Sequence, residues 1–356
     1  MRILYAASNM QHINSFHRPY IYALRNEGHD LKIMARGGGA DFNIPFEKKV
    51  FSFKNSECRK KIREIVAREG FDAIILNTSL AAYHVRRALD MHDRPRVVNF
   101  VHGYLFPLRG MGVKDRMLLY AEKSLKCKTD RILVMNKEDL EIAKRYRLSL
   151  SEPVLTRGMG AVCGEVRAER EHLRASLGAG GKLVLSFVGE LSERKNQRML
   201  IEALPILKKR VQRVALWLIG DGGAVSSLRG LASRLGVSNS VLFTGRRDNP
   251  CDFIRASDVY VSAARIEGMP FNVIEALGVG TPIVASDIKG HRDLLSGGAG
   301  LLYPLGDKEK FVECVLTASA RNEKMLKLGA QVYHDYSFEE VFSSTYRAVK
   351  EAIFCE

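Results

Sequence analysis

The sequence lacks three features, and each absence excludes a class of protein. None of its apolar runs approaches the length of a bilayer span, and residues 1–8 read as a buried strand without the charged leader of a signal peptide. Its six cysteines are scattered without paired spacing, which argues against a zinc site or a disulfide framework and fits a reducing cytoplasm. It contains no short-period repeat or low-complexity segment, so a solenoid is excluded.

The composition is that of a folded protein with an uneven charge. Hydrophobic residues make up 46% of the 356 positions and charged residues 27%, which is typical of globular proteins, and the length favours two domains. Residues 1–150 hold 28 Lys and Arg against 16 Asp and Glu, a net +12, whereas residues 151–356 hold 27 against 24, a net +3. The basic first half predicts an acidic partner: an anionic membrane face, a polyphosphate lipid or nucleic acid.

Short apolar runs alternate with amphipathic stretches along the chain. Because the runs are too short for helices, the alternation predicts parallel sheets covered by helices on both faces. In the first half we expect strands over residues 2–8, 31–35, 50–53, 72–76, 97–101 and 131–135, and helices over 16–27, 61–68, 80–89, 115–125 and 137–146. In the second half we expect strands over 182–189, 215–219, 241–244, 259–261, 283–285 and 300–303.

Two consecutive series of this kind predict two doubly wound, Rossmann-like α/β domains. Glycines at 158, 160 and 164 interrupt the pattern, so we place the boundary within residues 158–170 and assign residues 1–165 and 166–337 to the two domains. A long amphipathic helix is expected over residues 338–354, within a final segment 338–356.

Two glutamates eight positions apart, Glu267 and Glu275, are the most informative feature. A strand runs into the loop that carries Glu267, and an apolar helix then begins with Glu275 about one turn inside it. The free N–H groups of such a helix start suit a phosphate, whereas ionised carboxylates are acceptors that suit hydroxyls. This combination indicates a pocket for a nucleotide sugar, although an ordinary βαβ unit with a surface glutamate would show the same pair.

The stretch resembles the Glu-x7-Glu motif of retaining glycosyltransferases of family 4, whose two domains face a cleft in the GT-B fold. The resemblance implies that Glu267 contacts the donor sugar and that Glu275 holds the ribose hydroxyls. It also implies that the final helix packs back on the N-terminal domain, which would bind the acceptor while the C-terminal domain binds the nucleotide sugar. The implied donor-binding segment between the glutamates comprises Gly268, Met269, Pro270, Phe271 and Asn272.

Other strand ends of the second half also carry candidate donor contacts. Arg194 and Lys195 would neutralise the diphosphate, and Lys195 matches the lysine of the family. Glu190 occupies the usual arginine position, a departure that resembles the exopolysaccharide and capsule branch and leaves open whether Arg194 supplies the second positive charge. Gly220 and Arg247 lie in two further loops, which are either ligand contacts or ordinary turns.

The sequence contains no Asp-x-Asp motif and no His/Asp cluster with metal spacing, so neither a metal site nor a cofactor is expected. This agrees with the metal-independent chemistry of GT-B enzymes, in which basic side chains and helix dipoles stabilise the leaving group.

Histidines mark the candidate acceptor side of the first half. His102 follows the strand over 97–101 and precedes Gly103, and the family has a His-Gly beside the transfer point, which makes His102 a candidate catalytic residue; the alternative is a packed core histidine. His12 and His17 either line the acceptor cleft or cap a helix, and for His17 we favour the cap.

Residues 105–128 mix exposed apolar residues with cations. This pattern is typical of an interfacial segment that binds anionic lipid headgroups, although most charge runs are simply solvated helix faces. The basic charge of the first half favours the membrane. The candidate membrane and acceptor residues are Arg109, Lys114, Arg116, Lys123, Lys126 and Lys128.

Together with these patterns, the resemblance implies a retaining hexosyltransferase on the cytoplasmic face of the bacterial plasma membrane. The expected donor is a nucleotide sugar, by resemblance a UDP-sugar, and the expected acceptor is a lipid-linked saccharide of exopolysaccharide, capsule or O-antigen synthesis. One alternative is a non-transferring GT-B enzyme such as a UDP-sugar 2-epimerase, which would need no acceptor or membrane patch. The other is a basic nucleic-acid-binding protein, for which no recognised module is visible.

Overall fold

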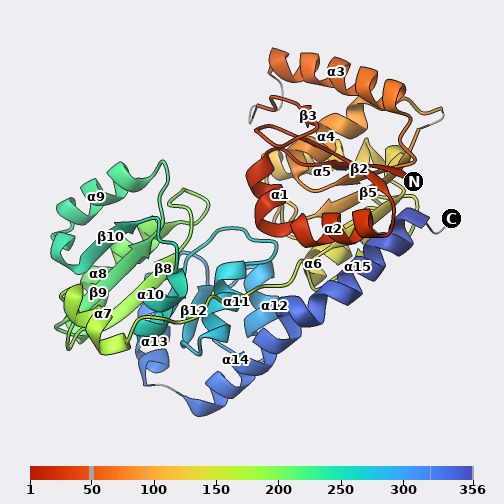
Figure 1. Ribbon diagram of the computed structural model, residues 1–356. Coiled ribbons are helices and arrows are strands. Elements are labelled where there is room, and N and C mark those ends of the chain that lie inside the picture. The colour runs from red at the N-terminus through yellow and green to blue at the C-terminus, as the bar shows by residue number, and fades with distance from the viewer. Residues whose placement is uncertain (48–51, 93, 321, 355–356) are drawn as a thin grey trace. The chain divides into compact units, whose positions relative to one another are not determined.

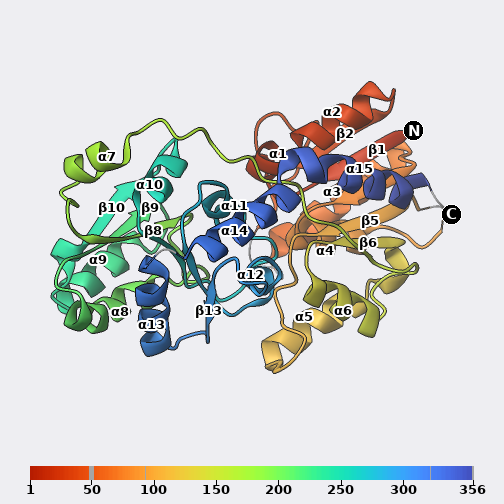
Figure 2. The same cartoon turned by 90° about the horizontal axis from the view of Figure 1, so that it is seen from below.

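The chain forms two α/β units in a computed structural model that describes residues 1–47, 52–92, 94–320 and 322–354 (Figure 1). Unit 1 comprises Met1–Met159 and Val341–Glu356, and unit 2 comprises Gly160–Glu340. Each unit is built around one parallel sheet. Figure 2 shows helices on both sides of each sheet, for example α7 and α10 on one side of the unit 2 sheet and α8 and α13 on the other.

Unit 1 contains a seven-stranded sheet in the order β3-β2-β1-β4-β5-β6-β7. Its strands are β1 Arg2–Ala6, β2 Asp30–Ala35, β3 Phe42–Asn43, β4 Ala73–Leu76, β5 Arg96–Val101, β6 Arg131–Val134 and β7 Val154–Leu155. Its helices are α1 Met10–Phe16, α2 Arg18–Asn26, α3 Phe53–Glu69, α4 Ser79–Ala88, α5 Val113–Lys123 and α6 Lys137–Arg145, with a 3₁₀ turn over Lys126–Lys128.

Unit 2 contains a six-stranded sheet in the order β10-β9-β8-β11-β12-β13. Its strands are β8 Leu183–Val188, β9 Val214–Ile219, β10 Val241–Gly245, β11 Val259–Ser262, β12 Ile283–Ser286 and β13 Leu301–Tyr303. Its helices are α7 Arg170–Ser176, α8 Gln197–Arg210, α9 Val225–Arg234, α10 Pro250–Ala256, α11 Phe271–Gly278, α12 Lys289–Leu295, α13 Lys308–Ser319 and α14 Glu323–Tyr336, with a 3₁₀ turn over Ser238–Ser240.

The strand order of each sheet reverses once, and this fixes where ligands bind. In unit 1 the chain moves outward from β1 in one direction and from β4 in the other, and in unit 2 the same reversal falls between β8 and β11. Parallel α/β sheets bind ligands beside the carboxyl ends of the strands at such a switch point. The loops after β1 and β4, and those after β8 and β11, are therefore the first places to look for a site.

The last helix, α15 (Phe338–Phe354), begins in unit 2 and continues into unit 1. Within unit 1, Arg96 Nε donates to the carbonyl of Ala352 at 2.7 Å, and Lys350 pairs with Glu27. The side chains of Val349 and Ile353 are buried. The end of the chain is thus part of the packing of unit 1.

The predicted fold class, two doubly wound α/β units, is confirmed. The two-residue edge strands β3 and β7 were not expected from the sequence. Of the strand expected over residues 50–53, Val50 and Phe51 lie outside the described residues, whereas Phe53 begins α3. No helix among the described residues is long and apolar enough to cross a bilayer.

Candidate functional site

The candidate donor site lies at the switch point of the unit 2 sheet. The loop after β8 carries Arg194 and Lys195, and the loop after β11 carries Glu267. Two hydrogen bonds join these loops: the Arg265 amide donates to the carbonyl of Arg194 at 2.9 Å, and the side chain of Asn196 donates to the carbonyl of Ala263 at 3.1 Å. Asn196 has a left-handed backbone (φ 55°), which the loop needs to turn into α8.

Glu267 is held between two cations. Lys195 Nζ lies 2.7 Å from Glu267 Oε1, an ion pair outside hydrogen-bond geometry, and Arg194 Nη1 donates to Glu267 Oε2 at 3.0 Å. The Glu267 side chain is only 8% exposed, whereas that of Arg194 is 44% exposed. A nearly buried carboxylate is stable here because two positive charges compensate its lost hydration. The structure thus brings together three residues that the sequence predicted for the site.

Helix α11 carries Glu275 and begins beside the end of β8. The Asn272 side chain donates to the carbonyl of Val188 at 2.7 Å and so fixes the start of α11 against that strand. Burial raises the pKa of Glu275 to about 7, with a contribution from nearby Cys251. Cys251 Sγ in turn lies 3.8 Å from Cys163 Sγ, so two of the cysteines that are scattered in the sequence are neighbours in space.

Three further positions bear on the donor site: the two predicted contacts Gly220 and Arg247, and Glu190, which departs from the family pattern. A Cβ atom on Gly220 would lie 1.9 Å from the carbonyl oxygen of Gly189, so close packing of the two strand ends requires glycine there. The Arg247 guanidinium lies over the ring of Phe253 at 5.8 Å. Glu190 is exposed, and it is Arg194 that stands beside Glu267 with Lys195. A direct ligand contact of Gly220 or Arg247 remains a prediction.

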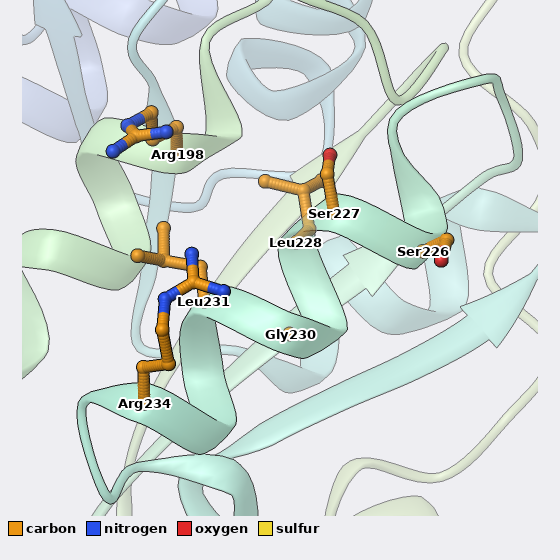
Figure 3. Close-up of a pocket in the computed structure, with 7 residues that line it drawn as sticks. All are labelled: Arg198, Ser226, Ser227, Leu228, Gly230, Leu231 and Arg234. Carbon is orange, nitrogen blue, oxygen red and sulfur yellow. The ribbon is translucent and has the colours of Figure 1, made fainter.

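A hollow of about 210 Å³ lies between α8 and α9 of unit 2 (Figure 3). It is lined by Arg198, Ser226, Ser227, Leu228, Gly230, Leu231 and Arg234. None of these residues belongs to the predicted donor site. Arg198 also pairs with Glu202 on its own helix at 2.8 Å.

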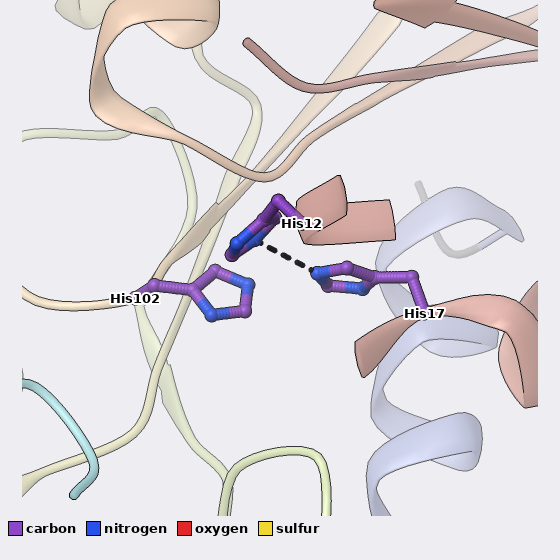
Figure 4. A group of neighbouring side chains, drawn as sticks. All are labelled: His12, His17 and His102. Carbon is purple, nitrogen blue, oxygen red and sulfur yellow. Dashed lines mark hydrogen bonds between the residues drawn. The ribbon is translucent and has the colours of Figure 1, made fainter. Parts of the chain in front are cut away.

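In unit 1 the switch point gathers three histidines (Figure 4). His12 lies on α1, His17 lies between α1 and α2, and His102 follows β5. His17 Nε2 lies 3.1 Å from His12 Nε2, and His17 Nδ1 lies 2.8 Å from the Tyr5 hydroxyl. Burial lowers the pKa of His12 to about 4 and lowers those of His17 and His102 as well, so all three rings are neutral near pH 7.

The structure corrects one expectation about these histidines and adds one observation that the sequence did not offer. His17 occupies the position before α2, but its side chain makes no capping hydrogen bond and is fully buried, so the predicted cap is wrong. The sequence shows no metal spacing, yet one nitrogen from each of the three rings lies within 4.8 Å of the others. The topology of the sheet, which brings the ends of β1, β4 and β5 to one edge, assembles a cluster that spacing along the chain does not reveal.

In the basic segment of residues 105–128, some side chains contact the rest of unit 1 and others are exposed. The buried Arg86 donates from Nη2 to both carboxylate oxygens of Glu122 on α5, at 3.0 and 2.9 Å, which attaches α5 to unit 1. Lys123 lies 6.0 Å from the ring of Tyr146. Lys128 donates to the carbonyl of Leu89, and burial lowers the pKa of Lys128. The remaining predicted cations of α5 and the preceding loop are exposed: Arg109, Lys114 and Arg116.

Comparison with known proteins shows which proteins the chain resembles. Residues 169–335 match the family of glycosyl transferases group 1. The whole fold resembles that of HepE from Anabaena in its complex with UDP and glucose, with a TM-score of 0.77 at 18% identity over 99% of this chain and 100% of that one. The chain thus has the fold of these GT-B proteins, and its second unit is similar to glycosyl transferases of group 1.

Two curated relatives span most of the chain. EpsD of Bacillus subtilis (strain 168), which is provisionally described as a glycosyltransferase, is 27% identical over 93% of this chain and 90% of its own length. The UDP-Gal:alpha-D-GlcNAc-diphosphoundecaprenol alpha-1,3-galactosyltransferase of Escherichia coli is 23% identical over 86% of this chain and 83% of its own length.

Proposed function

We propose that this protein is a retaining hexosyltransferase. It would transfer the sugar of a UDP-sugar donor to a lipid-linked saccharide in bacterial surface polysaccharide synthesis. The observation that carries the proposal is Glu267 held between Lys195 and Arg194 at the switch point of unit 2. A nucleoside diphosphate needs cations, and the sugar attached to it needs a group that accepts hydrogen bonds from its hydroxyls. The two cations and the carboxylate of this trio supply both at adjacent places.

The trio also accounts for the chemistry of donor cleavage. When the bond between the sugar and the diphosphate breaks, negative charge grows on the departing phosphate, and Lys195 and Arg194 stabilise that charge. Before the donor binds, Glu267 pairs with both cations, and the trio keeps one net positive charge. Donor binding then lets them turn to the diphosphate while Glu267 accepts hydrogen bonds from sugar hydroxyls. No metal ion is needed to hold the diphosphate in this arrangement. As the acceptor oxygen bonds to the sugar, the acceptor hydroxyl gives its proton to the departing diphosphate.

The relatives support the choice of donor and acceptor. HepE is known as a complex with UDP and glucose, and the Escherichia coli relative is named for UDP-Gal and a diphosphoundecaprenol-linked sugar. Both names fit a UDP-sugar donor, and the second fits a lipid-linked acceptor. We assign Glu275 to the ribose hydroxyls and His102 to the acceptor side on the family resemblance.

The surface of α5 supports docking at an anionic membrane. Val113, Met117 and Tyr120 are 79%, 60% and 75% exposed. They recur at spacings of four and three, so they share one face of the helix. The exposed Lys114 and Arg116 lie on either side of this apolar stripe. An apolar stripe flanked by cations suits the boundary between headgroups and acyl chains, which supports our proposal that the protein docks on the cytoplasmic face of the plasma membrane.

The test is a thermal-shift panel of UDP, GDP, ADP and CMP on the full chain. We expect UDP alone to raise the unfolding temperature, and Glu275→Ala to weaken UDP binding by about 1.5–3 kcal/mol, the loss of one hydrogen bond to a charged group. The matched control is Glu309→Ala, an exposed glutamate on α13. Failure of every nucleotide to stabilise the protein would refute the donor site.

A product assay separates transfer from the epimerase alternative. With UDP-sugar and a diphosphoprenyl-linked sugar, a transferase yields UDP and an extended lipid. Conversion of the UDP-sugar to its 2-epimer, with or without hydrolytic release of UDP and independent of the lipid, would identify the non-transferring enzyme instead.

A further inference from the structure

The three histidines at the switch point of unit 1 are arranged as ligands around a common point. Their ring centroids are separated by 4.6 Å for His12 and His102, 4.9 Å for His17 and His102, and 5.0 Å for His12 and His17. The rings of His12 and His17 each meet the ring of His102 edge to face. Figure 4 shows all three rings turned toward one another. Three rings of similar mutual distance form a cluster rather than a stack.

The distances fit a small cation. A tetrahedral ion about 2.0–2.1 Å from each nitrogen places those nitrogens about 3.3 Å apart. The His12 and His17 Nε2 atoms already lie 3.1 Å apart, and one nitrogen of each of the three rings lies within 4.8 Å of the others. Only a small displacement of His102 would complete a three-nitrogen set.

The surroundings of the rings fit metal ligation as well. Ligating histidines usually bind through one nitrogen while the other is held by an oxygen atom. The second nitrogen of His17 contacts the Tyr5 hydroxyl at 2.8 Å, and the His12 ring hydrogen-bonds the backbone of Asn77. The buried Nε2 of His102 has no hydrogen-bond partner in the structure. An unpartnered buried nitrogen facing two others is the atom that an ion would satisfy.

We propose that His12, His17 and His102 bind one divalent cation of the Zn²⁺ class. Neutral imidazole is the ligand form, and three imidazoles favour zinc over magnesium or calcium, which prefer oxygen. Three protein nitrogens leave a fourth position for an oxygen ligand, either water or a hydroxyl of the acceptor. The site lies wholly within unit 1, so it does not depend on the donor site of unit 2.

The experiment titrates the full chain, stripped with a chelator, with Co²⁺ as a visible probe and with Zn²⁺ as competitor. We expect one Co²⁺ per chain with the intense visible bands of a four-coordinate site, displaced by Zn²⁺, and a higher unfolding temperature with either ion. His17→Gln should reduce the affinity for Co²⁺ at least about tenfold, because one of three ligands is lost.

The matched control is His84→Gln, since His84 is also buried in unit 1 but lies outside the cluster. It should keep the stoichiometry and spectrum of the unaltered protein. If His17→Gln does not fold, His102→Gln carries the same test, because that ring is less buried. Absence of Co²⁺ binding, or binding that survives both cluster variants, would show that the trio is only a hydrogen-bonded imidazole cluster. Stabilisation by UDP, measured in the same samples, reports the donor site separately.

Discussion

At the residue scale, the two glutamates of the motif differ in how their charge is compensated. Glu267 is nearly buried and pairs with Lys195 and Arg194. Glu275 lies partly buried on α11, where burial and Cys251 raise its pKa to about 7. In the folded protein the proton therefore leaves Glu275 at a higher pH than it would in the unfolded chain, where a glutamate has a pKa of about 4.5.

This difference predicts how stability depends on pH. Because the folded pKa is raised, the contribution of Glu275 to stability is fully present below pH 4.5 and is lost as the pH rises through about 7. At pH 8 the Glu275→Gln variant should be more stable than the unaltered protein by about 3 kcal/mol, at about 1.4 kcal/mol per pKa unit.

The measurement is urea unfolding followed by the fluorescence of Trp217, the single tryptophan, which is buried in β9 of unit 2. The gain should disappear near pH 4.5. A gain of equal size at both pH values would mean that the glutamine acts by something other than removal of a buried charge. The exposed Glu309→Gln should change stability at neither pH.

At the element scale, the packing of β8 against β9 depends on a glycine. Gly220→Ala places a Cβ atom 1.9 Å from the carbonyl oxygen of Gly189, at a backbone φ of 137° that side chains rarely adopt. We expect a loss of about 2 kcal/mol or more in the free energy of unfolding. Gly230→Ala on α9 should instead stabilise by about 0.5–1 kcal/mol, since its Cβ meets only ordinary contacts. Trp217 fluorescence checks both, and losses of equal size in the two variants would contradict the steric argument.

The sequence predicts the elements of this fold better than it predicts the contacts between them. Strands such as β8 and β11 are visible as apolar runs because both faces of a parallel sheet are buried. The edge strands β3 and β7 were missed because two residues carry no periodicity. The pair of Glu267 and Glu275 could likewise be predicted, because the two residues are close together in the sequence.

The histidine cluster illustrates what the sequence does not reveal. His12, His17 and His102 meet only because the strand order of unit 1 places β1 next to β4 and β4 next to β5. The proximity of the free thiols of Cys163 and Cys251 likewise depends on folding of unit 2. Contacts between segments far apart in the sequence depend on the strand order of the sheet. Short sequence patterns do not predict which individual residues this order brings together.

At the scale of the whole molecule, the charge asymmetry and the surface of α5 belong to the same unit. Residues 1–150 carry a net +12, and the exposed Val113, Met117 and Tyr120 lie within them. The opposite face of α5 is anchored by Leu119, which is buried in the core, and by the pair between Arg86 and Glu122. Because the anchoring and exposed faces are separate, the exposed face can be changed without unfolding the helix.

We therefore predict that Met117→Asp combined with Tyr120→Asp releases the protein from vesicles that contain anionic phosphatidylglycerol. Each change removes an apolar side chain from the interface and adds a charge that the anionic surface repels, so flotation affinity should fall about tenfold or more. Tyr22→Asp on α2 is the control, since Tyr22 is 53% exposed in the same unit. It should float as before, and UDP should still raise the unfolding temperature of all variants. Raised salt should weaken flotation of the unaltered protein, because the cations beside the stripe are screened. Unchanged flotation of the double variant would show that another surface contacts the membrane.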